Sequence, residues 1–577
     1  MQILALSISV ISGKIYSMEN LKTQIKDIIK SLYDIDESQV DFSEVPANIA
    51  GDYSTNIAMR LAKRVGKNPR QVAEEIIAQL GDEYIFTIAG PGFINVEVSA
   101  KKLQEKLASE FSENFGSNNS GEGKTAIVEF PSTNMAKPYS VGHLRPGTQG
   151  WATKKVLEAN GWKVVTDNHL GDTGTPFGVW VVGFLRSGMS LDDVTIYDLG
   201  QIYIDTKKAL KEEAAEGKHE LADQTQEWLQ KLEAKDPQAV EYSERFNKIS
   251  LDHVHSVMKR MAISTDLELG ESFYAEPGKE LVQKFLAEGK FEQNDDGSVI
   301  CRLDEAGIDV PMLVLKSNGT ALYATTDLAC MFYRKENYNP DLVVYCVGAE
   351  QKFYFEQLFA MGKKLGLQQE NFHLWFGTID VINDEGKREK MSSRKGVVLL
   401  EAMLDDAEAR VRKNFAGSEL SDEDVRRIAT GAIKFSDFVA DRKMGILYDP
   451  DKIFALTGFS GPFCQYADVR LRRILEKNKD FTRVDFSDYD FAAEKDLLIR
   501  INKFPELVSN VVEKLELHKI AGYCFELAQD LNRYYEKTPI TQADDKERSA
   551  RLWLIEKADF VLAKALDLLG VEIPEKM

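Results

Sequence analysis

Cysteine is scarce in this chain, and long apolar runs are absent from it. The five cysteines are scattered over 577 residues, and no two of them have the Cys-x-x-Cys spacing. This distribution argues against a zinc knuckle and a disulfide framework, and it fits a reducing cytoplasm. No run reaches the roughly 20 apolar residues that a membrane span requires, so we expect no membrane segment.

Positive charge is also in deficit. The chain has 72 lysines and arginines against 92 acidic residues, which gives a formal net charge of −20. This argues against a protein coated in basic patches. It leaves an RNA partner possible, because RNA binding depends on where the cations lie. The length and the 44% apolar content predict several domains with more than one core, and the sequence shows no internal repeat.

The first 17 residues are apolar apart from Lys14. They lack the basic start and the small-residue cleavage site of a signal peptide. A helical pattern begins at Met18-Glu-Asn-Leu. We therefore expect Met18 to be the true start and residues 1–17 to be a dispensable extension.

The chain from Met18 to about residue 105 predicts a small α+β module. Helical spacing comes first, residues 51–56 predict a turn leading into a helix through Ala62, and residues 84–88 and 93–98 alternate as strands. A Gly-, Ser- and Asn-rich linker follows at 116–123.

Residues 125–380 alternate between short apolar runs and helical patterns. The expected strands are 125–130, 163–167, 310–315, 341–348 and 373–380, and the expected helices are 147–160, 324–337 and 352–366. This alternation predicts an α/β domain whose Rossmann-like parallel sheet is covered by helices on both faces. Ligands bind such sheets at the carboxyl ends of the strands.

Polar helices interrupt this pattern, and more helices follow it. The interval from about 190 to 300 is read as an insertion with a helix over 212–232. After Gly396 the chain is helical to its end, with a helix opening at 461–467 and a last one over 552–569.

The stretch from Val128 to Gly150 carries the first chemical signal. The expected strand ends near Glu129, the segment from Pro131 to Pro138 is irregular, and a helix is expected to begin near Gly142-His143. Unpaired amides and the positive end of a helix dipole make this a candidate anion site, and His143 places an imidazole beside it. The alternatives are a tight turn and an imidazole that only caps the helix.

A second signal lies far downstream, between Gly386 and Gly396. Five of the nine residues from Lys387 to Lys395 are cationic, and the flanking glycines suit a mobile loop. Taken alone, such a run is usually a solvated surface loop.

Together, the two stretches resemble the two signatures of class I aminoacyl-tRNA synthetases, and among them the arginyl-tRNA synthetases. The matches are Ser140-Val-Gly-His143 and Lys390-Met-Ser-Ser393, and the resemblance covers Met18 to Met577. It implies five parts: an extension (1–17), an N-terminal tRNA-contacting domain (18–105), a class I catalytic domain (120–400) with the insertion at about 190–300, a helical stem (401–455) and an all-α anticodon-binding bundle (456–577).

The resemblance implies an arginine–tRNA ligase. Such an enzyme uses ATP with Mg²⁺ and joins L-arginine to the arginine tRNA, and we expect a cytoplasmic monomer. The alternative is a non-catalytic tRNA-binding relative whose nucleotide site has decayed.

Family roles carry over onto individual positions of this sequence. For catalysis and ATP they fall on His143, Lys390, Lys137, Ser140, Gly142 and Ser392. For the substrate they fall on Glu129, Tyr323 and Asp327 at the guanidinium, and on Asn134 and Gln351 at the amino-acid head. For tRNA the candidates are Arg470, Arg473 and Phe463.

Carboxylates suit the planar guanidinium of an arginine substrate because they accept from it at bidentate geometry. An aspartate after a strand is more often a helix cap, which is the alternative for Asp327. No metal ligand is expected from protein side chains, because His253 and His255 are two apart in a helical pattern and face different sides.

The chain also departs from the family pattern. Ser140 stands where the first signature histidine is usual, Tyr354 where another histidine is, and Thr326 where arginine is common; Thr173 and Pro176 replace usual Trp and Gln. These replacements affect the ATP and arginine pockets and are the reason for keeping the non-catalytic alternative.

Overall fold

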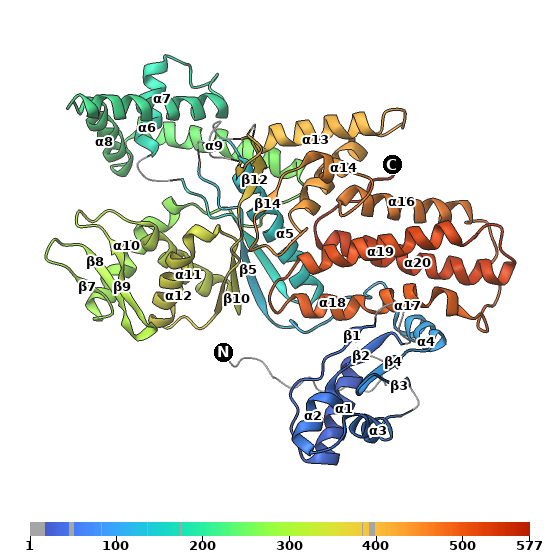
Figure 1. Ribbon diagram of the computed structural model, residues 1–577. Coiled ribbons are helices and arrows are strands. Elements are labelled where there is room, and N and C mark those ends of the chain that lie inside the picture. Colours follow the sequence, from blue (N-terminus) through green and yellow to red (C-terminus); the bar gives the residue numbers. More distant parts are fainter. Residues whose placement is uncertain are drawn as a thin grey trace. The chain divides into compact units, whose positions relative to one another are not determined.

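The computed structural model describes residues 18–45, 51–81, 84–135, 137–172, 176–383, 385–391 and 398–577. The chain divides into two compact units (Figure 1). The first comprises the described residues up to Phe115 together with Thr482–Lys503 and Glu536–Lys557. The second comprises Gly116–Phe481, Phe504–Tyr535 and Ala558–Met577. The predicted extension, residues 1–17, lies outside the described residues.

The first unit contains the predicted α+β module. A sheet of order β1-β2-β4-β3 pairs antiparallel throughout, and helices accompany it. The bounds are α1 (Met18–Tyr33), β1 (Ser43–Glu44), β2 (Tyr53–Thr55), α2 (Ile57–Val65), α3 (Pro69–Ile77), β3 (Ile85–Ala89), β4 (Phe93–Glu97) and α4 (Ala100–Glu110).

The predicted turn over 51–56 is wrong at its centre, where Tyr53–Thr55 forms strand β2. Tyr53 and Thr55 are buried and Ser54 between them is less so, which is the period-two pattern of a strand paired with β4. Three residues are too few to show this alternation clearly in sequence.

Helices of the C-terminal part complete the first unit. They include η4 (Phe491–Glu494) and α17 (Lys495–Asn502). The ammonium of Lys495 lies 3.0 Å from Asp52 and 3.1 Å from Glu97, so this helix is joined to the N-terminal sheet by ion pairs as well as by packing.

The second unit is built on a four-stranded parallel sheet of order β11-β10-β5-β6. Its strands are β5 (Thr125–Glu129), β6 (Lys163–Asp167), β10 (Leu342–Tyr345) and β11 (Glu370–His373). Alternate residues of β5 enter different cores: Ala126 and Val128 pack in one, and Ile127 packs in the other. The helices are α5 (Leu144–Ala159), α11 (Tyr323–Tyr338) and α12 (Lys352–Lys364), so the predicted α/β class is confirmed.

One of the predicted strands does not belong to this sheet. Residues 310–315 fall in β9 (Ile308–Leu315), which pairs antiparallel with β8 (Val299–Leu303), next to β7 (Glu292–Gln293). A short apolar run has the same appearance in any sheet, because strand pairing is decided by distant residues.

The run 373–380 is divided between two sheets. β11 ends at His373, and β12 (Ile379–Ile382) lies between β13 (Arg388–Lys390) and β14 (Ile446–Leu447). At Gly377, an added Cβ would lie 2.7 Å from the backbone of Met444, so only glycine fits this crossing.

The insertion is a group of helices with a core of its own (Figure 1). They are α6 (Pro176–Ser187), α7 (Ile196–Ala215), α8 (Glu220–Glu233) and α9 (Pro237–Arg260), followed by α10 (Glu271–Ala287). The single helix predicted over 212–232 is wrong, because the chain breaks at Gly217, which adopts a φ of 72°.

After Gly396 the described chain is mostly helical, as predicted, apart from the short strand β14. The remaining elements are η1 (Val141–His143), η2 (Asp304–Ala306), η3 (Ala349–Gln351), α13 (Leu400–Asn414), α14 (Asp422–Ser436), α15 (Pro450–Ile453), α16 (Gly461–Lys477), α18 (Phe504–Val511), α19 (His518–Lys537) and α20 (Asp545–Leu568). Among the described residues, no helix is both long and apolar enough to cross a membrane.

A buried ion pair connects α5 to elements far along the chain. Arg145 Nε lies 2.6 Å from Asp437 Oδ1, and the side chains are 2% and 0% exposed. The same guanidinium donates through Nη1 to the carbonyl oxygens of Gly377, at 2.8 Å, and Met444, at 2.9 Å. On α5 itself, Gln149 donates to the second Asp437 oxygen at 2.8 Å. One guanidinium therefore holds α5 against α14 and the β12–β14 region.

We predict that Asp437→Ala lowers the free energy of unfolding by about 3–5 kcal/mol, because the Arg145 guanidinium is left buried without its counter-charge. The measurement is urea denaturation followed by tryptophan fluorescence. As the control, Glu158→Ala removes the more exposed Lys154–Glu158 pair and should cost about 1 kcal/mol or less. Equal small losses in both variants would contradict the structural importance of Arg145.

Candidate active site

The segment after β5 is fixed by backbone bonds to the loop after β6. Gly171 donates to the carbonyl oxygen of Thr133 at 2.9 Å, and Met135 donates to that of Gly171 at 3.0 Å. A Cβ at Gly171 would lie 2.5 Å from Asn134 Oδ1, so a larger residue there would displace the Asn134 side chain. The structure thereby holds Asn134 just beyond the carboxyl end of β5.

The two signature regions, distant in sequence, meet through backbone pairing. Val141 donates to the carbonyl oxygen of Val398 at 2.9 Å, and Leu400 donates to that of Tyr139 at 3.0 Å. On the other side of the basic loop, Lys390 ends β13 and pairs with Asp380 of β12. Both ends of the loop are therefore anchored, and one of them is anchored to the segment that carries His143. Ser392 and the rest of the loop, to residue 397, lie outside the described residues.

His143 has a defined orientation at the start of α5. Its Nδ1 accepts the backbone N–H of Ser140 at 3.1 Å, and its ring stacks on Tyr139 with the centroids 4.7 Å apart. A nitrogen that accepts carries no proton, so the proton of the neutral ring lies on Nε2, which is left as a donor. Burial and the nearby charge of Lys137 lower the pKa of His143 to about 4.

The other predicted residues of the ATP side lie close in sequence. The Ser140 hydroxyl is 3.3 Å from His143 Nδ1, so it faces the histidine, and Gly142 is exposed. Lys137 Nζ lies 5.4 Å from the centre of the Tyr203 ring. Partial burial and the like charge of Lys207 lower the pKa of Lys137.

Glu129 lies in a row of paired residues at the carboxyl edge of the sheet, opposite Tyr345 on one side and Asp167 on the other. Arg334 of α11 is 1% exposed, and its Nη2 lies 2.6 Å from Glu129 Oε2 and 2.7 Å from Asp167 Oδ2. The other Glu129 oxygen accepts from the Ser132 hydroxyl at 3.2 Å. Glu129 is therefore already paired with an arginine of the chain itself.

Arg334 and Asp167 are not among the residues that the sequence patterns single out. Their only signals are an arginine within the predicted 324–337 helix and an acid at the end of the predicted 163–167 strand. Neither signal distinguishes a buried charge from an exposed one.

Tyr323 and Asp327 share one face of α11, one turn apart. Tyr323 opens the helix with its side chain 67% exposed. Asp327 accepts a hydrogen bond from the Tyr354 hydroxyl, and its Oδ1 lies 3.4 Å from His169 Nε2. The alternative of a helix cap is wrong, because Asp327 lies within α11 and its bonds go to side chains of other elements.

Tyr354, which replaces a histidine of the family pattern, is thus a partner of Asp327. Burial and the adjacent carboxylate raise the pKa of Tyr354, so its hydroxyl keeps the proton that it donates. At another departure, the Thr326 hydroxyl donates back to the Tyr323 carbonyl oxygen at 3.0 Å. Pro176 opens α6, and Thr173 lies outside the described residues.

Gln351 is exposed at the end of η3, six positions past the last residue of β10. Because β10 and β5 are adjacent parallel strands, Gln351 and Asn134 follow the same edge of the sheet.

The three residues predicted to contact tRNA all have partners within the chain. Arg470 donates to Asn532 at 2.9 Å and lies 4.1 Å from the Tyr535 ring centre. Arg473 donates to the Met577 carbonyl oxygen at 2.9 Å, and Phe463 packs against another aromatic ring. Their role toward RNA stays a prediction.

Histidines 253 and 255 have different partners. His255 Nε2 lies 2.8 Å from Glu268, whereas the His253 ring contacts Tyr197 edge-on. Within the part of the chain that the structure describes, no group of three His, Cys, Asp or Glu residues is arranged to hold a metal ion.

Comparison with known protein families first gives the class of protein. Residues 103–449 match the family model described as the catalytic domain of class I (R) tRNA synthetases, and residues 464–577 match the DALR anticodon binding domain. Residues 19–98 match the arginyl tRNA synthetase N terminal domain.

Individual relatives agree with this match. The chain is 30% identical to the arginine–tRNA ligase of Halothermothrix orenii, over 97% of this chain and 100% of that protein. It is 33% identical to the arginine–tRNA ligase of Azotobacter vinelandii, over 91% of this chain and 93% of that protein. The chain belongs to the arginyl-tRNA synthetase family.

Solved structures show the same fold. The arginyl-tRNA synthetase of Thermus thermophilus superposes with a TM-score of 0.80 at 23% identity, covering 97% of this chain and 100% of the other. That of Plasmodium falciparum gives 0.78 at 21% identity, covering 97% and 99%.

We predict that the His143 ring stays neutral until well below pH 5, with a titration midpoint near 4. The measurement is the pH dependence of the histidine ring resonances by NMR, assigned by their loss in His143→Asn. The unfolded chain takes up this proton near pH 6.5 and the folded chain only near 4, so lowering the pH through this window destabilises the fold. A midpoint near 6.5 would contradict the geometry described for this ring.

Proposed function

We propose that the chain is an arginine–tRNA ligase, which activates L-arginine with ATP and transfers it to the arginine tRNA. The observation that carries the proposal is the pairing of residues 139–141 with 398–400. It brings the His143 signature and one anchor of the basic loop to the same end of a parallel sheet. No observation favours the non-catalytic alternative: His143 keeps an oriented donor, and the named relatives match over nearly the full chain.

The ATP side is assigned to the start of α5 and the two signatures. In the proposed reaction, the arginine carboxylate attacks the ATP α-phosphate and pyrophosphate leaves. Negative charge develops on phosphate oxygens, so preorganised donors and cations should supply the rate. Nε2–H of His143 and the N-terminal amides of α5 suit the phosphates, and Lys390 and Lys137 suit the departing pyrophosphate. Mg²⁺ would arrive bound to ATP and offset part of its charge.

The arginine side is assigned to the face of α11 and the ends of β5 and β10. Asp327 is the carboxylate proposed for the substrate guanidinium, with the Tyr323 ring beside it. The hydrogen bond from Tyr354 and the His169 ring nitrogen, 3.4 Å away, favour one direction of the Asp327 carboxylate. Asn134 and Gln351 would hold the amino-acid head.

Glu129 is assigned to the same guanidinium side, and Arg334 limits what it can do there. Because one of its oxygens accepts from Arg334, Glu129 can offer the substrate only its remaining acceptor capacity.

The proposal also covers the contacts with tRNA, the oligomeric state and the location in the cell. The C-terminal helices, with Arg470, Arg473 and Phe463, are proposed for the tRNA anticodon region and the N-terminal module for another part of the tRNA. We propose a monomer in the cytoplasm, where the five buried free cysteines would stay reduced.

The test is arginine-dependent ATP–pyrophosphate exchange with and without tRNA, followed by single-turnover aminoacylation.

We predict that His143→Ala and Lys390→Ala each lower the rate roughly 10²–10³-fold, because each removes a preorganised donor where charge develops. Ser140→Ala, which removes only an uncharged hydroxyl, should lose much less. A wild-type chain without exchange, or a His143→Ala variant as fast as wild type, would overturn the proposed function.

We predict that Asp327→Asn raises the KM for arginine far more than the KM for ATP. Removing one partner of a buried charge pair costs about 2–5 kcal/mol, so a loss of at least roughly 30-fold is expected for arginine. The measurement is steady-state exchange with each substrate varied in turn. If both constants rise equally, Asp327 has only a structural role.

A further inference from the structure

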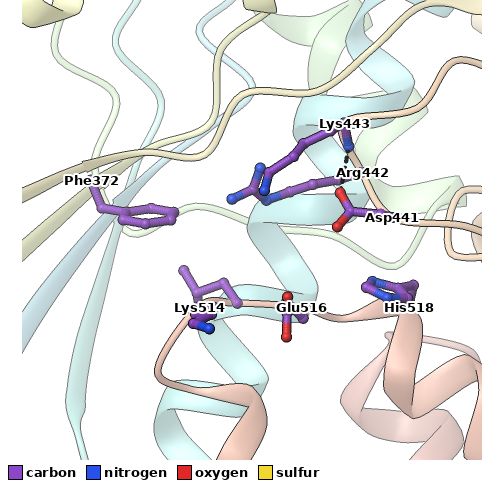
Figure 2. Close-up of a pocket in the computed structure, with 8 residues that line it drawn as sticks. Phe372, Asp441, Arg442, Lys443, Lys514, Glu516 and His518 are labelled. Carbon is purple, nitrogen blue, oxygen red and sulfur yellow. Dashed lines mark hydrogen bonds between the residues drawn. The ribbon is translucent and has the colours of Figure 1, made fainter.

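A cavity in the larger unit uses none of the residues assigned above. Its volume is about 160 Å³, and it is lined by Phe372, Asp441, Arg442, Lys443, Lys514, Leu515, Glu516 and His518 (Figure 2). These residues come from the edge strand β11, the loop after α14 and the turn that leads into α19.

Arg442 is the buried cation of this cavity. Its side chain belongs to a residue only 9% exposed, and Nη1 donates to the Trp375 carbonyl oxygen at 2.9 Å. Its guanidinium carbon lies 5.6 Å from the Phe372 ring centre and 5.9 Å from that of Trp375. A guanidinium has five N–H donors, and this single bond fixes its position while using one of them. Within the described residues, no carboxylate pairs with it.

Three further groups bring positive potential to the same space. Lys443 and Lys514 are exposed, and neither forms an ion pair within the part of the chain that the structure describes. His518 is the first residue of α19, so the positive end of a 20-residue helix faces this region.

The two acidic side chains of the lining are engaged locally. Asp441 accepts the backbone N–H of Lys443 at 2.9 Å, as the dashed line in Figure 2 shows. Burial opposes the charge of this carboxylate, but the hydrogen bond from Lys443 helps to lower the pKa of Asp441 below its usual value. Glu516 pairs with Lys519, outside the lining, at 2.5 Å, and this hydrogen bond lowers the pKa of Glu516. Both carboxylates are thus ionised, but the charge of Glu516 is offset by Lys519, which does not line the cavity. The lining keeps a surplus of positive charge.

We propose that this cavity is a phosphate-binding site. A buried, fixed guanidinium, two free ammonium groups and a helix N-terminus surround a volume that suits one tetrahedral anion with acceptor oxygens on every side. A planar carboxylate would leave one of these directions unused. The phosphate comes either from a small molecule such as inorganic phosphate or from the backbone of the bound tRNA. The second source depends on the proposed function, and the first does not.

The first arm of the test is calorimetric titration of inorganic phosphate into the full chain, with the active site filled by arginine and a non-hydrolysable ATP analogue. We expect saturable binding that weakens at least roughly tenfold in the Lys443→Ala/Lys514→Ala double variant, because charge-assisted hydrogen bonds are removed. Lys413→Ala, an exposed lysine on α13 outside the cavity, is the matched control and should bind as wild type does. Arg442→Lys tests the buried cation while keeping its charge.

The second arm measures tRNA affinity against salt concentration for the same variants. If a tRNA phosphate occupies the cavity, the slope of log K against log salt should fall by about 0.7–0.9 for each lysine–phosphate pair that a variant removes. Weaker phosphate binding in the double variant supports the site, and a smaller salt slope shows that a tRNA phosphate occupies it. No change in both arms overturns it.

Exchange activity at saturating tRNA separates this proposal from the previous one. The double variant should retain the wild-type exchange rate, because the cavity contains none of the assigned active-site residues. A wild-type chain that lacks exchange but binds phosphate would overturn the proposed function and leave the cavity site standing.

Discussion

The buried pair between Arg145 and Asp437 is the constraint on which the candidate active site depends. A charge without water must be met by an opposite charge and by hydrogen bonds, and both are present here. The guanidinium also donates to the carbonyl oxygens of Gly377 and Met444. It therefore helps to position α5 relative to the sheet of β12, β13 and β14. That sheet carries Lys390 and α5 begins next to His143, so this side chain adds to the backbone pairing of residues 139–141 with 398–400 in positioning the two signatures.

A second guanidinium organises the arginine side. Arg334 joins the ends of β5 and β6 through Glu129 and Asp167, which would otherwise be two adjacent carboxylates at the edge of the sheet. Like charges side by side repel, and the Arg334 guanidinium between them offsets that repulsion. Asp327, whose partners are the Tyr354 hydroxyl and His169, is not paired with an arginine of the described chain, and it is the acid of this edge that we propose for a cationic substrate.

Local pattern predicted most elements of the parallel sheet and its helices, although the expected strand 373–380 overlaps β11 only at His373. The runs 125–130 and 163–167 and the helices 324–337 and 352–366 agree with β5, β6, α11 and α12 to within a few residues, because short apolar runs alternate here with longer helical patterns. The pattern could not show that residues 310–315 pair antiparallel in another sheet, because pairing is a long-range choice. For the same reason Arg145, Asp437 and Arg334 could not be singled out: only the assembled fold shows that these charges are buried. The site residues that were predicted came from a resemblance, whereas their partners came from the structure.

The bond that sets the proton of His143 comes from the backbone of residue 140. Any residue with a backbone N–H can supply it, and among the common amino acids only proline cannot. The backbone bond to the imidazole is therefore independent of which side chain position 140 carries, and serine at this position leaves that bond in place.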